Sequence, residues 1–435
     1  MIHILSSNGF HRIESLKEQT ENETIKSFQP DKVYIPAVDN KGLPLDKEIA
    51  IPSSVSIGTL LGIRKDFGVP IYSSVSGKVI GKAKKFNGAL GRLSDFFEIE
   101  NNKKNERVTL APLAIDATQA DLVNKLKEGG IVGLGGAGFP AFIKYNIKPE
   151  MKIDHIIINA CECEPYLTTD YNVGIKSELA YMLKALKTIM DILAIPSTII
   201  ATKNEKTALI EKISKDIEAF GDNRISMQGV KSVYPAGYER TLIKFLLKRD
   251  YIKLPSEAHV IVSNLQTMIA IGDLFAEGKT ISDKVITVSG CVKNPANVSI
   301  PYGTLIKDII SFVGGYTIEK GVLLNGGPMT CEHLGTDDVP LLIQNDAITV
   351  LKEKNLVAEP CLRCGKCTAH CPVNIQPVEI NMAAKRGDYQ RCFELGVMDC
   401  VLCGICSYVC PSHIEVSAGV KQAKLMTMFK VAKKK

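Results

Sequence analysis

Short apolar segments follow a polar lead-in at the start of the chain, and they predict a small β-domain. Residues 1–30 are polar and rich in acids, so we expect an irregular or loosely attached lead-in there. From Lys32 onward, apolar pieces alternate with Gly, Pro and Asn-Gly turn signals, a pattern typical of short strands. These pieces lie at 33–36, 49–51, 71–74 and 77–80.

Helical and strand patterns alternate from residue 117 onward, which predicts an α/β domain with a mainly parallel sheet. The expected helices are 122–127, 177–194 and 205–218, and the expected strands are 155–159 and 198–202. Beyond this domain we expect strands and one helix in an order that fits a compact β-grasp-like module. They lie at 283–301, 303–315, 322–324 and 347–351. After Pro360 short helices follow, the last over 416–431.

The chain therefore predicts an α/β multidomain protein, since its 435 residues are too many for one core. The stretch 69–80 is similar to the strand pattern of barrel-sandwich or lipoyl-like domains, and we expect it to be structural because no obvious carrier lysine is present. The predicted units are a lead-in (1–30), a barrel-sandwich-like β-domain (31–110), a Rossmann-like α/β domain (111–280), an SLBB-like β-grasp domain (281–352) and a helical C-terminal domain (353–435).

Composition and charge exclude several classes of protein. With 45% hydrophobic and 23% charged residues, the chain is globular rather than disordered or a coiled coil. The net charge of +6 includes six lysines and no acid from Val416 to Lys435. A solvated C-terminus explains this excess, and an anionic partner or membrane surface is the alternative. No basic face interleaved with aromatic residues is evident, so we predict no nucleic-acid partner.

The sequence predicts neither a signal peptide nor a transmembrane helix. Its N-terminus lacks a basic region followed by an apolar stretch. The two most apolar candidates, 180–200 and 259–275, are interrupted by charged or amide side chains. We therefore expect any association with a membrane to depend on partners.

Two cysteine runs near the C-terminus carry the strongest chemical signal. Each has the spacing C-x2-C-x2-C-x3-C-P, in which three thiolates hold one [4Fe-4S] cluster and the fourth reaches the neighbouring cluster. We therefore predict two [4Fe-4S] clusters with crossed ligands. One cluster is held by Cys361, Cys364, Cys367 and Cys410, and the other by Cys400, Cys403, Cys406 and Cys371.

Zinc is the alternative interpretation of C-x2-C pairs, but it needs only four ligands from two pairs and no second run of four. Gly365 and Gly404 lie where the chain must pass a cluster without a Cβ. Cluster-binding thiolates indicate a reducing cytosol rather than a disulfide framework. We expect Cys161 and Cys163 to be ordinary buried thiols, not a third metal site. Because the clusters only move electrons, the rest of the chain should supply a source or sink.

A glycine-rich segment of the α/β domain favours a phosphate site. Gly133, Gly135 and Gly138 satisfy G-x-G-x-x-G, and Pro140 is expected at the first position of a helix. Backbone N–H groups of such a turn can bind an anion together with the helix dipole, although a tight structural turn would need the same glycines.

Polar residues directly follow the predicted strand 155–159. Asn159, Glu162 and Glu164 stand at the carboxyl end of a parallel strand, where α/β sheets bind ligands. An Asn can bond the edge of a flavin ring, and a carboxylate can accept a ribose hydroxyl or a nicotinamide amide. A solvated acidic loop would not explain why the acids follow a buried strand.

These pieces together resemble a known family. The segments 133–144 and 159–165, with 234–243 and 262–267, are similar to the flavin and NADH site of the large NADH-binding subunit of respiratory complex I. Within that superfamily, the cysteine runs, the β-domain, 73–77 and 326–329 resemble the RnfC family, which belongs to the Rnf complex. That membrane complex couples ferredoxin oxidation and NAD reduction to ion pumping. The resemblance covers roughly residues 31–415.

The resemblance implies FMN and NAD(H) as cofactors beside the two clusters. The implied cofactor-binding residues are Gly133, Gly135, Gly136, Gly138, Phe139, Lys144, Asn159, Glu162, Glu164, Gly237, Glu239, Asn264 and Thr267. The glycines and Lys144 would hold the FMN phosphate, while Glu164 and Glu239 would line the nicotinamide pocket. No catalytic acid or base is implied, because hydride transfer needs none.

Two further pairs complete the implied flavin site. Asn159 and Glu162 would touch the isoalloxazine or ribityl group, and Asn264 with Thr267 would close the FMN site. The chain departs from the family pattern at Ala141, where Thr is usual, and at Tyr238, where a small or acidic residue is common. Its N-terminus also lacks the family's His-Pro-Pro segment.

The resemblance further implies an NADH-dependent electron-transfer subunit, peripheral at the cytoplasmic face of the membrane. Its partners would be the other Rnf proteins, among them the ferredoxin-like RnfB and the membrane subunits, with ferredoxin reached indirectly. Three alternatives stay open. They are a soluble flavin and iron–sulfur cobalamin reductase of a propanediol-utilisation microcompartment, a cluster-only relay scaffold, and a membrane-docking module that uses the lysine-rich tail.

Overall fold

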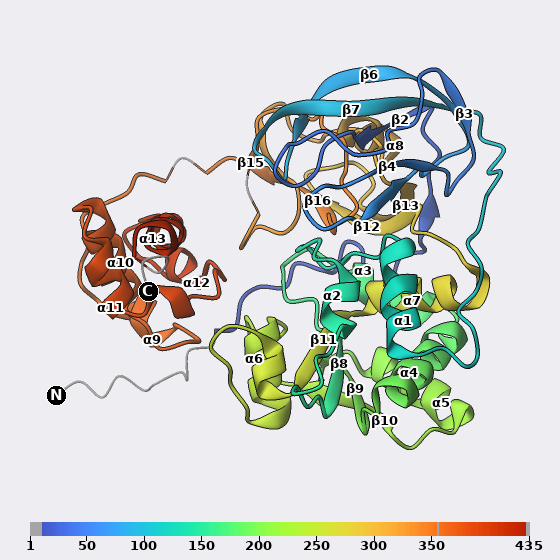
Figure 1. Cartoon of the computed structure of the whole chain (residues 1–435). Coiled ribbons are helices and arrows are strands. Elements are labelled where there is room, and N and C mark those ends of the chain that lie inside the picture. The colour runs from blue at the N-terminus through green and yellow to red at the C-terminus, as the bar shows by residue number, and fades with distance from the viewer. Residues whose placement is uncertain (1–10, 332, 355, 432–435) are drawn as a thin grey trace.

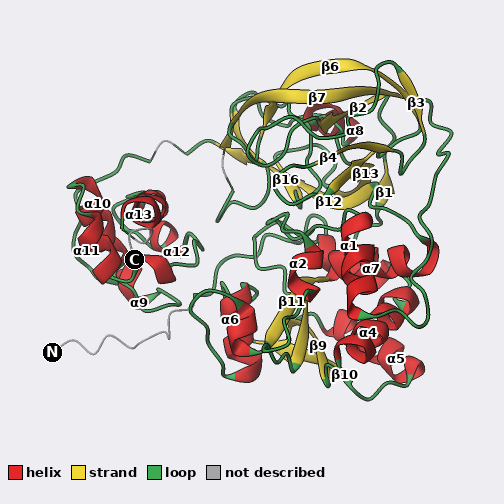
Figure 2. Ribbon diagram, in the orientation of Figure 1, coloured by secondary structure: helices red, strands yellow, loops and turns green. Residues whose placement is uncertain are grey.

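The computed structural model describes residues 11–431 except Glu332 and Asn355 (Figure 1). A β-rich region lies above a mixed α/β region, and a small helical lobe lies to one side of them at the C-terminal end (Figure 2). No helix among the described residues is both long and apolar enough to cross a membrane.

The N-terminal β-region is built from an antiparallel four-stranded sheet in the order β2-β7-β6-β3 and a small two-stranded sheet. Its strands are β2 (Lys32–Pro36), β3 (Ser53–Val55), β4 (Leu60–Ile63), β5 (Pro70–Tyr72), β6 (Gly77–Asn87) and β7 (Arg92–Asn101). Alternate residues of β2 and β7, such as Val33, Ile35 and Ile99, are fully buried in its core. The prediction of a strand at 49–51 is wrong, because this segment makes one backbone bond to Leu61 and then meets Pro52, which has no N–H to donate.

The α/β region has a four-stranded sheet in the order β10-β9-β8-β11, and all three pairings are parallel. Its strands are β8 (His155–Asn159), β9 (Ser197–Lys203), β10 (Ile225–Val230) and β11 (Val260–Asn264). Its helices are α1 (Gln119–Glu128), α2 (Ala141–Tyr145), α3 (Thr169–Lys176), α4 (Ala180–Leu193), α5 (Thr207–Phe220), α6 (Glu239–Leu247) and α7 (Leu265–Glu277), with the 3-10 turn η1 (Pro255–Ala258). The predicted parallel sheet is confirmed.

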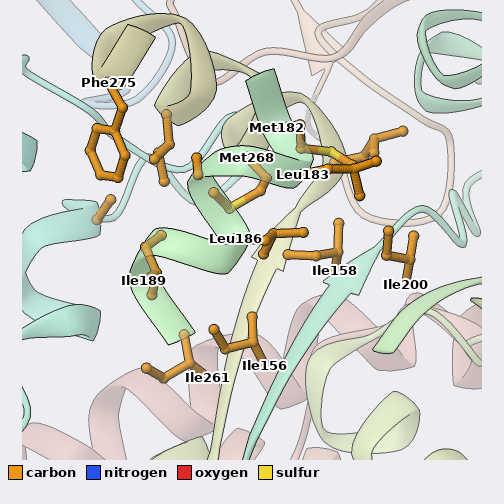
Figure 3. Packing of buried hydrophobic residues seen from close by; sticks show 14 of the residues in the cluster. Ile156, Ile158, Met182, Leu183, Leu186, Ile189, Ile200, Ile261, Met268 and Phe275 are labelled. Carbon is orange, nitrogen blue, oxygen red and sulfur yellow. The ribbon is translucent and has the colours of Figure 1, made fainter. Parts of the chain in front are cut away.

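The two inner strands of this sheet carry continuous apolar runs, 156–158 in β8 and 199–201 in β9, because both faces of the sheet are covered there. Ile156 and Ile158 of β8 pack with Leu186 and Ile189 of α4 and with Met268 of α7 (Figure 3). Ile157, which points to the opposite face, belongs to a second cluster with residues of α6. Alternate residues of β8 therefore face opposite sides of the sheet, and the buried positions of α4, which recur with the helical period, cover the side of Ile156 and Ile158.

A six-stranded mixed sheet follows in the order β1-β13-β12-β16-β14-β15. Its members are β1 (Lys26–Ser27), β12 (Asp283–Gly290), β13 (Ala296–Pro301), β14 (Gly321–Leu324), β15 (His333–Leu334) and β16 (Ala347–Lys352), with helix α8 (Ile306–Phe312) packed on it. The elements expected over 283–351 are thus present in order.

The expectation of a loosely attached lead-in is wrong for residues 11–30, while residues 1–10 lie outside the described part. Strand β1 pairs in parallel with β13. Lys17 and Thr20 are 3% and 0% exposed, respectively. Polar residues are buried here because each finds a partner, and such pairing leaves no trace in the hydropathy pattern.

The C-terminal lobe consists of short helices. They are α9 (Lys366–Ala369), α10 (Pro377–Lys385), α11 (Tyr389–Glu394), α12 (Ile405–Tyr408) and α13 (Val416–Lys430), with the 3-10 turn η2 (Val397–Asp399). Ile380 of α10, Val420 of α13 and Cys392 are buried together in its core. Helices α9 and α12 each begin inside one of the cysteine runs, so the runs lie in one lobe.

Candidate functional site

The glycine-rich segment forms a loop between α1 and α2 that lies against the end of β11. A Cβ on Gly135 would stand 3.1 Å from the Cβ of Asn264, so the close approach requires glycine. Gly136 and Gly138 have φ values of +102° and +59°, in the region that favours glycine. Pro140 is the N-cap residue of α2 and not its first helical residue, so the helix begins one residue later than expected.

Asn264 and Thr267 hold this loop to the sheet. The Asn264 carboxamide oxygen accepts the backbone N–H of Gln266 at 2.9 Å and so caps α7, while its NH2 group donates to Asp170 at 2.7 Å. The Thr267 hydroxyl accepts the N–H of Leu134 at 2.9 Å. The predicted closing residues therefore do meet the glycine loop.

Asn159 and Gly237, predicted from separate motifs, also meet. The Asn159 NH2 group donates to the Gly237 carbonyl at 2.7 Å, and its oxygen accepts the N–H of Cys161 at 3.0 Å. The Gly237 N–H in turn donates to the Cys163 sulfur at 2.8 Å. Both cysteines are buried free thiols, as expected. We call residues 159–165 the β8 loop.

The two acids of the β8 loop turn in different directions. Glu162 accepts the Thr169 hydroxyl at 2.7 Å and the Asp170 N–H at 3.0 Å, so its carboxylate caps the start of α3. Its own backbone has φ +31°. Glu164 accepts the N–H of Met329 at 3.0 Å and the hydroxyl of Thr330 at 2.5 Å. Burial raises the pKa of Glu164.

Lys144 and Glu239 lie close to each other near the end of β11. The Lys144 ammonium donates to the Val262 carbonyl at 2.8 Å and stands 3.7 Å from the Glu239 carboxylate. Glu239 also accepts the Tyr251 hydroxyl at 3.3 Å. Phe139 is 38% exposed and lies edge-on to Phe67.

Sequence reasoning missed Lys17, because nothing in a polar lead-in signals a buried cation. Its ammonium donates to the Glu162 carbonyl at 2.7 Å and lies 3.9 Å from the Glu162 carboxylate. Burial lowers the pKa of Lys17 to about 8, although Glu162 opposes the shift. Lys17 therefore anchors Glu162, whose backbone has a positive φ.

A buried acid pair beside the glycine loop was also missed. Asp170 accepts the amides of Asn264 and Gln266, and burial together with Glu162 and Asp346 raises its pKa to about 8. Asp346 pairs with Lys284, whose ammonium also donates to the Leu134 carbonyl. Asp170 lies in the first turn of α3, where acidic residues are common. The sequence therefore gave no sign that this carboxyl group would be buried beside the glycine loop.

The cysteine runs surround a hollow inside the C-terminal lobe. We call residues 361–371 the outer run and residues 400–410 the inner run. A cavity of about 1310 Å³ is lined by six motif cysteines, namely Cys367, Cys371, Cys400, Cys403, Cys406 and Cys410. Among the described residues, no three His, Cys, Asp or Glu side chains stand close enough to hold a single metal ion. Thiols spread around a wide space fit polynuclear clusters better than zinc.

Both runs use glycine for backbone conformation. Gly365 and Gly404 precede α9 and α12 with φ values of +73° and +77°. A Cβ on Gly365 would meet open space, whereas one on Gly404 would stand 2.1 Å from the Met329 carbonyl oxygen. Both positions therefore adopt a left-handed turn, and Gly404 in addition lies against Met329. The expected close approach of both glycines to a cluster stays a prediction.

The inner run packs against the α/β region. Cys403 and Ile405 belong to the same buried cluster as Cys161, Cys163 and Tyr234. The Arg240 guanidinium contacts Asp399, immediately before this run, at 3.4 Å. The inner run therefore lies next to the β8 loop.

The fold and these contacts define a chain with a flavin-nucleotide domain of the complex I type. Residues 126–273 match the Nuo51 FMN-binding domain, and residues 285–331 match the SLBB domain. A crystal structure of an NAD+-reducing [NiFe]-hydrogenase is similar with a TM-score of 0.50 and 16% identity, over 72% of this chain and 62% of that one. This likeness concerns the fold alone.

The chain belongs to the RnfC family, whose members are components of ion-translocating ferredoxin:NAD+ oxidoreductase (Rnf) complexes. It is 31% identical to the corresponding protein of the proton-translocating complex of Clostridium ljungdahlii, over 89% of this chain and 86% of the relative. It is also 31% identical to its counterpart in the Na+-translocating complex of Acetobacterium woodii, over 85% of each. The resemblance drawn from the motifs is confirmed.

Proposed function

We propose that this chain passes electrons between NAD(H), FMN and two [4Fe-4S] clusters as a peripheral subunit of an ion-translocating ferredoxin:NAD+ oxidoreductase complex. Its proposed partners are the ferredoxin-like RnfB and the membrane subunits, at the cytoplasmic face. Family membership supports the complex. The single observation that carries the electron path is the buried cluster in which Cys403 and Ile405 of the inner run lie together with Cys161 and Cys163 of the β8 loop.

The donor set fits the implied cofactors. The cavity of about 1310 Å³ between six motif cysteines supports two clusters, with the crossed ligands predicted from the spacing. The backbone of the glycine loop is open to close approach, because Gly136 and Gly138 carry no side chain and have left-handed φ values. We therefore assign the FMN phosphate to this loop, between Asn264, Thr267 and Lys144.

When bound, FMN supplies the step between a two-electron donor and one-electron acceptors. A hydride from NADH amounts to two electrons and one proton; the cysteines of the two runs would hold clusters that can accept one electron each, and the proton would be released to water. The protein's part is placement. Asn159 fixes Gly237, Asn264 and Thr267 fix the glycine loop, and Lys17 fixes the backbone of Glu162.

The nicotinamide side is assigned to Glu239 and Glu164. Glu239 borders a cavity of about 300 Å³ that reaches Cys400, and Arg240, Lys253 and Lys424 supply positive charge around it. Such charge favours the pyrophosphate of a dinucleotide. The Glu164 carboxylate accepts hydrogen bonds from Met329 and Thr330. Beside lining the nicotinamide pocket, Glu164 would therefore hold the loop that contains these two residues in place.

We assign the first acceptor to the inner cluster, that of Cys400, Cys403, Cys406 and Cys371. Cys403 is 6% exposed and lies in the buried cluster shared with the α/β region, and Cys406, 9% exposed, lies in the core of the C-terminal lobe, whereas Cys361 and Cys364 are exposed. The outer cluster then stands where a partner can reach it.

An anaerobic titration of the reconstituted chain with NADH tests this function. We expect one FMN and about eight iron atoms per chain, with bleaching of flavin absorbance followed by cluster absorbance. A chain that holds iron but binds no FMN, and that NADH does not bleach, would instead be a cluster-only relay.

A further inference from the structure

Tyr234 lies at the junction between the α/β region and the C-terminal lobe. It is 1% exposed, and its hydroxyl donates to the backbone carbonyl of Cys403 at 2.5 Å. The proton is used in that bond, so the hydroxyl of Tyr238, 3.0 Å away, donates to the Tyr234 oxygen. A buried tyrosine is thus bonded directly to the peptide of a predicted cluster ligand.

The backbone of Tyr234 is fixed from the other side. Its N–H donates to the His11 carbonyl at 2.8 Å, and its carbonyl accepts the His11 N–H at 3.1 Å. Three residues further on, Gly237 is bound to Asn159 and Cys163 of the β8 loop. The segment 234–237 therefore connects the proposed flavin site with the inner run through a short chain of hydrogen bonds.

The bonded carbonyl controls the direction of a ligand. The peptide between Cys403 and Gly404 carries this carbonyl, and Gly404 stands at φ +77° directly before α12. Fixing that peptide plane fixes the direction in which the Cys403 Cα–Cβ bond points. Arg240 adds a second, longer contact to the same lobe at Asp399, so Tyr234 is the closest of these ties.

We propose that Tyr234 is a positioning residue, which holds the inner cluster at the distance and orientation needed for electron transfer from the flavin. This inference rests on the proposed function and deepens it. The rate of electron transfer falls steeply with the separation of two centres, so a small displacement of the inner run slows this step and leaves the reaction of NADH with the flavin unchanged. No electron or proton is stored on Tyr234 itself.

The test compares Tyr234→Phe with Tyr389→Phe in the reconstituted full chain. Tyr389 is also a tyrosine of the C-terminal lobe, at the start of α11, but it lies outside both cysteine runs. The measurements are FMN and iron per chain, rapid mixing with NADH, and electron paramagnetic resonance of the reduced clusters. Tyr234→Phe should keep both cofactors and the wild-type rate of flavin bleaching, and should slow cluster bleaching roughly tenfold.

A spectroscopic readout separates positioning from general destabilisation. In Tyr234→Phe the signal of the inner cluster should change while that of the outer cluster stays as in the wild type, and Tyr389→Phe should change neither. Tyr238→Phe removes only the second bond of the pair and should slow cluster bleaching by less, which provides the test if Tyr234→Phe does not fold.

Wild-type cluster bleaching and an unchanged inner-cluster signal in Tyr234→Phe would overturn the assignment, and so would the same result in Tyr238→Phe if Tyr234→Phe does not fold. Failure of the proposed function gives a different result, because the wild-type chain itself would then show no cluster bleaching by NADH.

Discussion

The outer and inner cysteine runs have the same spacing and opposite surroundings. Cys361 and Cys364 are exposed, and Leu362 between them is 71% exposed. In the inner run, Cys403 and Cys406 are buried, and Ile405 is 1% exposed. Under crossed ligation the difference becomes sharper, because the inner cluster would take the buried Cys371 and the outer one the half-buried Cys410. A duplicated motif can therefore serve two roles, decided by what packs against each copy.

The strongest way to break this comparison is to remove one ligand from each cluster. Cys403→Ala and Cys364→Ala should each lower the iron content from about eight to about four atoms per chain, with FMN retained. Iron and flavin determination after anaerobic reconstitution checks this. An iron content that stays at about eight in either variant would contradict the ligand assignment.

A second comparison uses the two matched glycines. Gly365→Ala and Gly404→Ala both place a Cβ in left-handed backbone, at a cost of roughly 1–2 kcal/mol. Only Gly404→Ala also forces a side chain against Met329, and such overpacking adds about 1–3 kcal/mol. Denaturant unfolding of the reconstituted variants should therefore show the larger loss for Gly404→Ala. Equal losses would mean that the contact between the inner run and residues 327–330 is not maintained in solution.

Lys17 gives a smaller effect that sharpens the picture of the β8 loop. Lys17→Met keeps the length of the side chain but removes its bond to the Glu162 carbonyl. We expect FMN to bind roughly ten- to hundredfold more weakly, since a hydrogen bond from a charged group contributes about 1.5–3 kcal/mol. Fluorescence titration of the apoprotein with FMN measures this. Lys26→Met, in the half-buried strand β1, serves as the control and should bind FMN as the wild type does.

The pH dependence of stability offers the smallest and most specific signal. The pKa of Lys17 is lowered from 10.5 to about 8 in the folded chain, so the unfolded state binds more protons between these values. The unfolding free energy of the wild type should therefore rise with pH from about 8 to 10.5 relative to that of Lys17→Met. A constant difference between the two across this range would show that Lys17 is not buried as a cation.

Local pattern was sufficient for much of the fold. Strand β8 spans 155–159 as predicted, around the apolar run 156–158, and α4 follows its helical period, because both bury apolar surface. The family motifs likewise singled out Asn159, Asn264 and Thr267, which lie against Gly237 and the glycine loop, while their contacts with FMN stay a prediction. The site residues whose contacts the sequence did not reveal are Lys17, Asp170 and Tyr234. Each makes a polar contact with a residue more than 90 positions away, and such partners cannot be predicted from the spacing of residues in a motif.

The most direct test of the electron path is freeze-quenching of the two ligand variants after mixing with NADH. Cys364→Ala keeps the inner cluster. We predict that this cluster is reduced as fast as the first cluster to be reduced in the wild type. Cys403→Ala, which keeps only the outer cluster, should bleach its flavin but leave that cluster oxidised on the same timescale. If the outer cluster of Cys403→Ala is reduced as fast as the inner cluster of Cys364→Ala, the inner run is not the entry point for electrons.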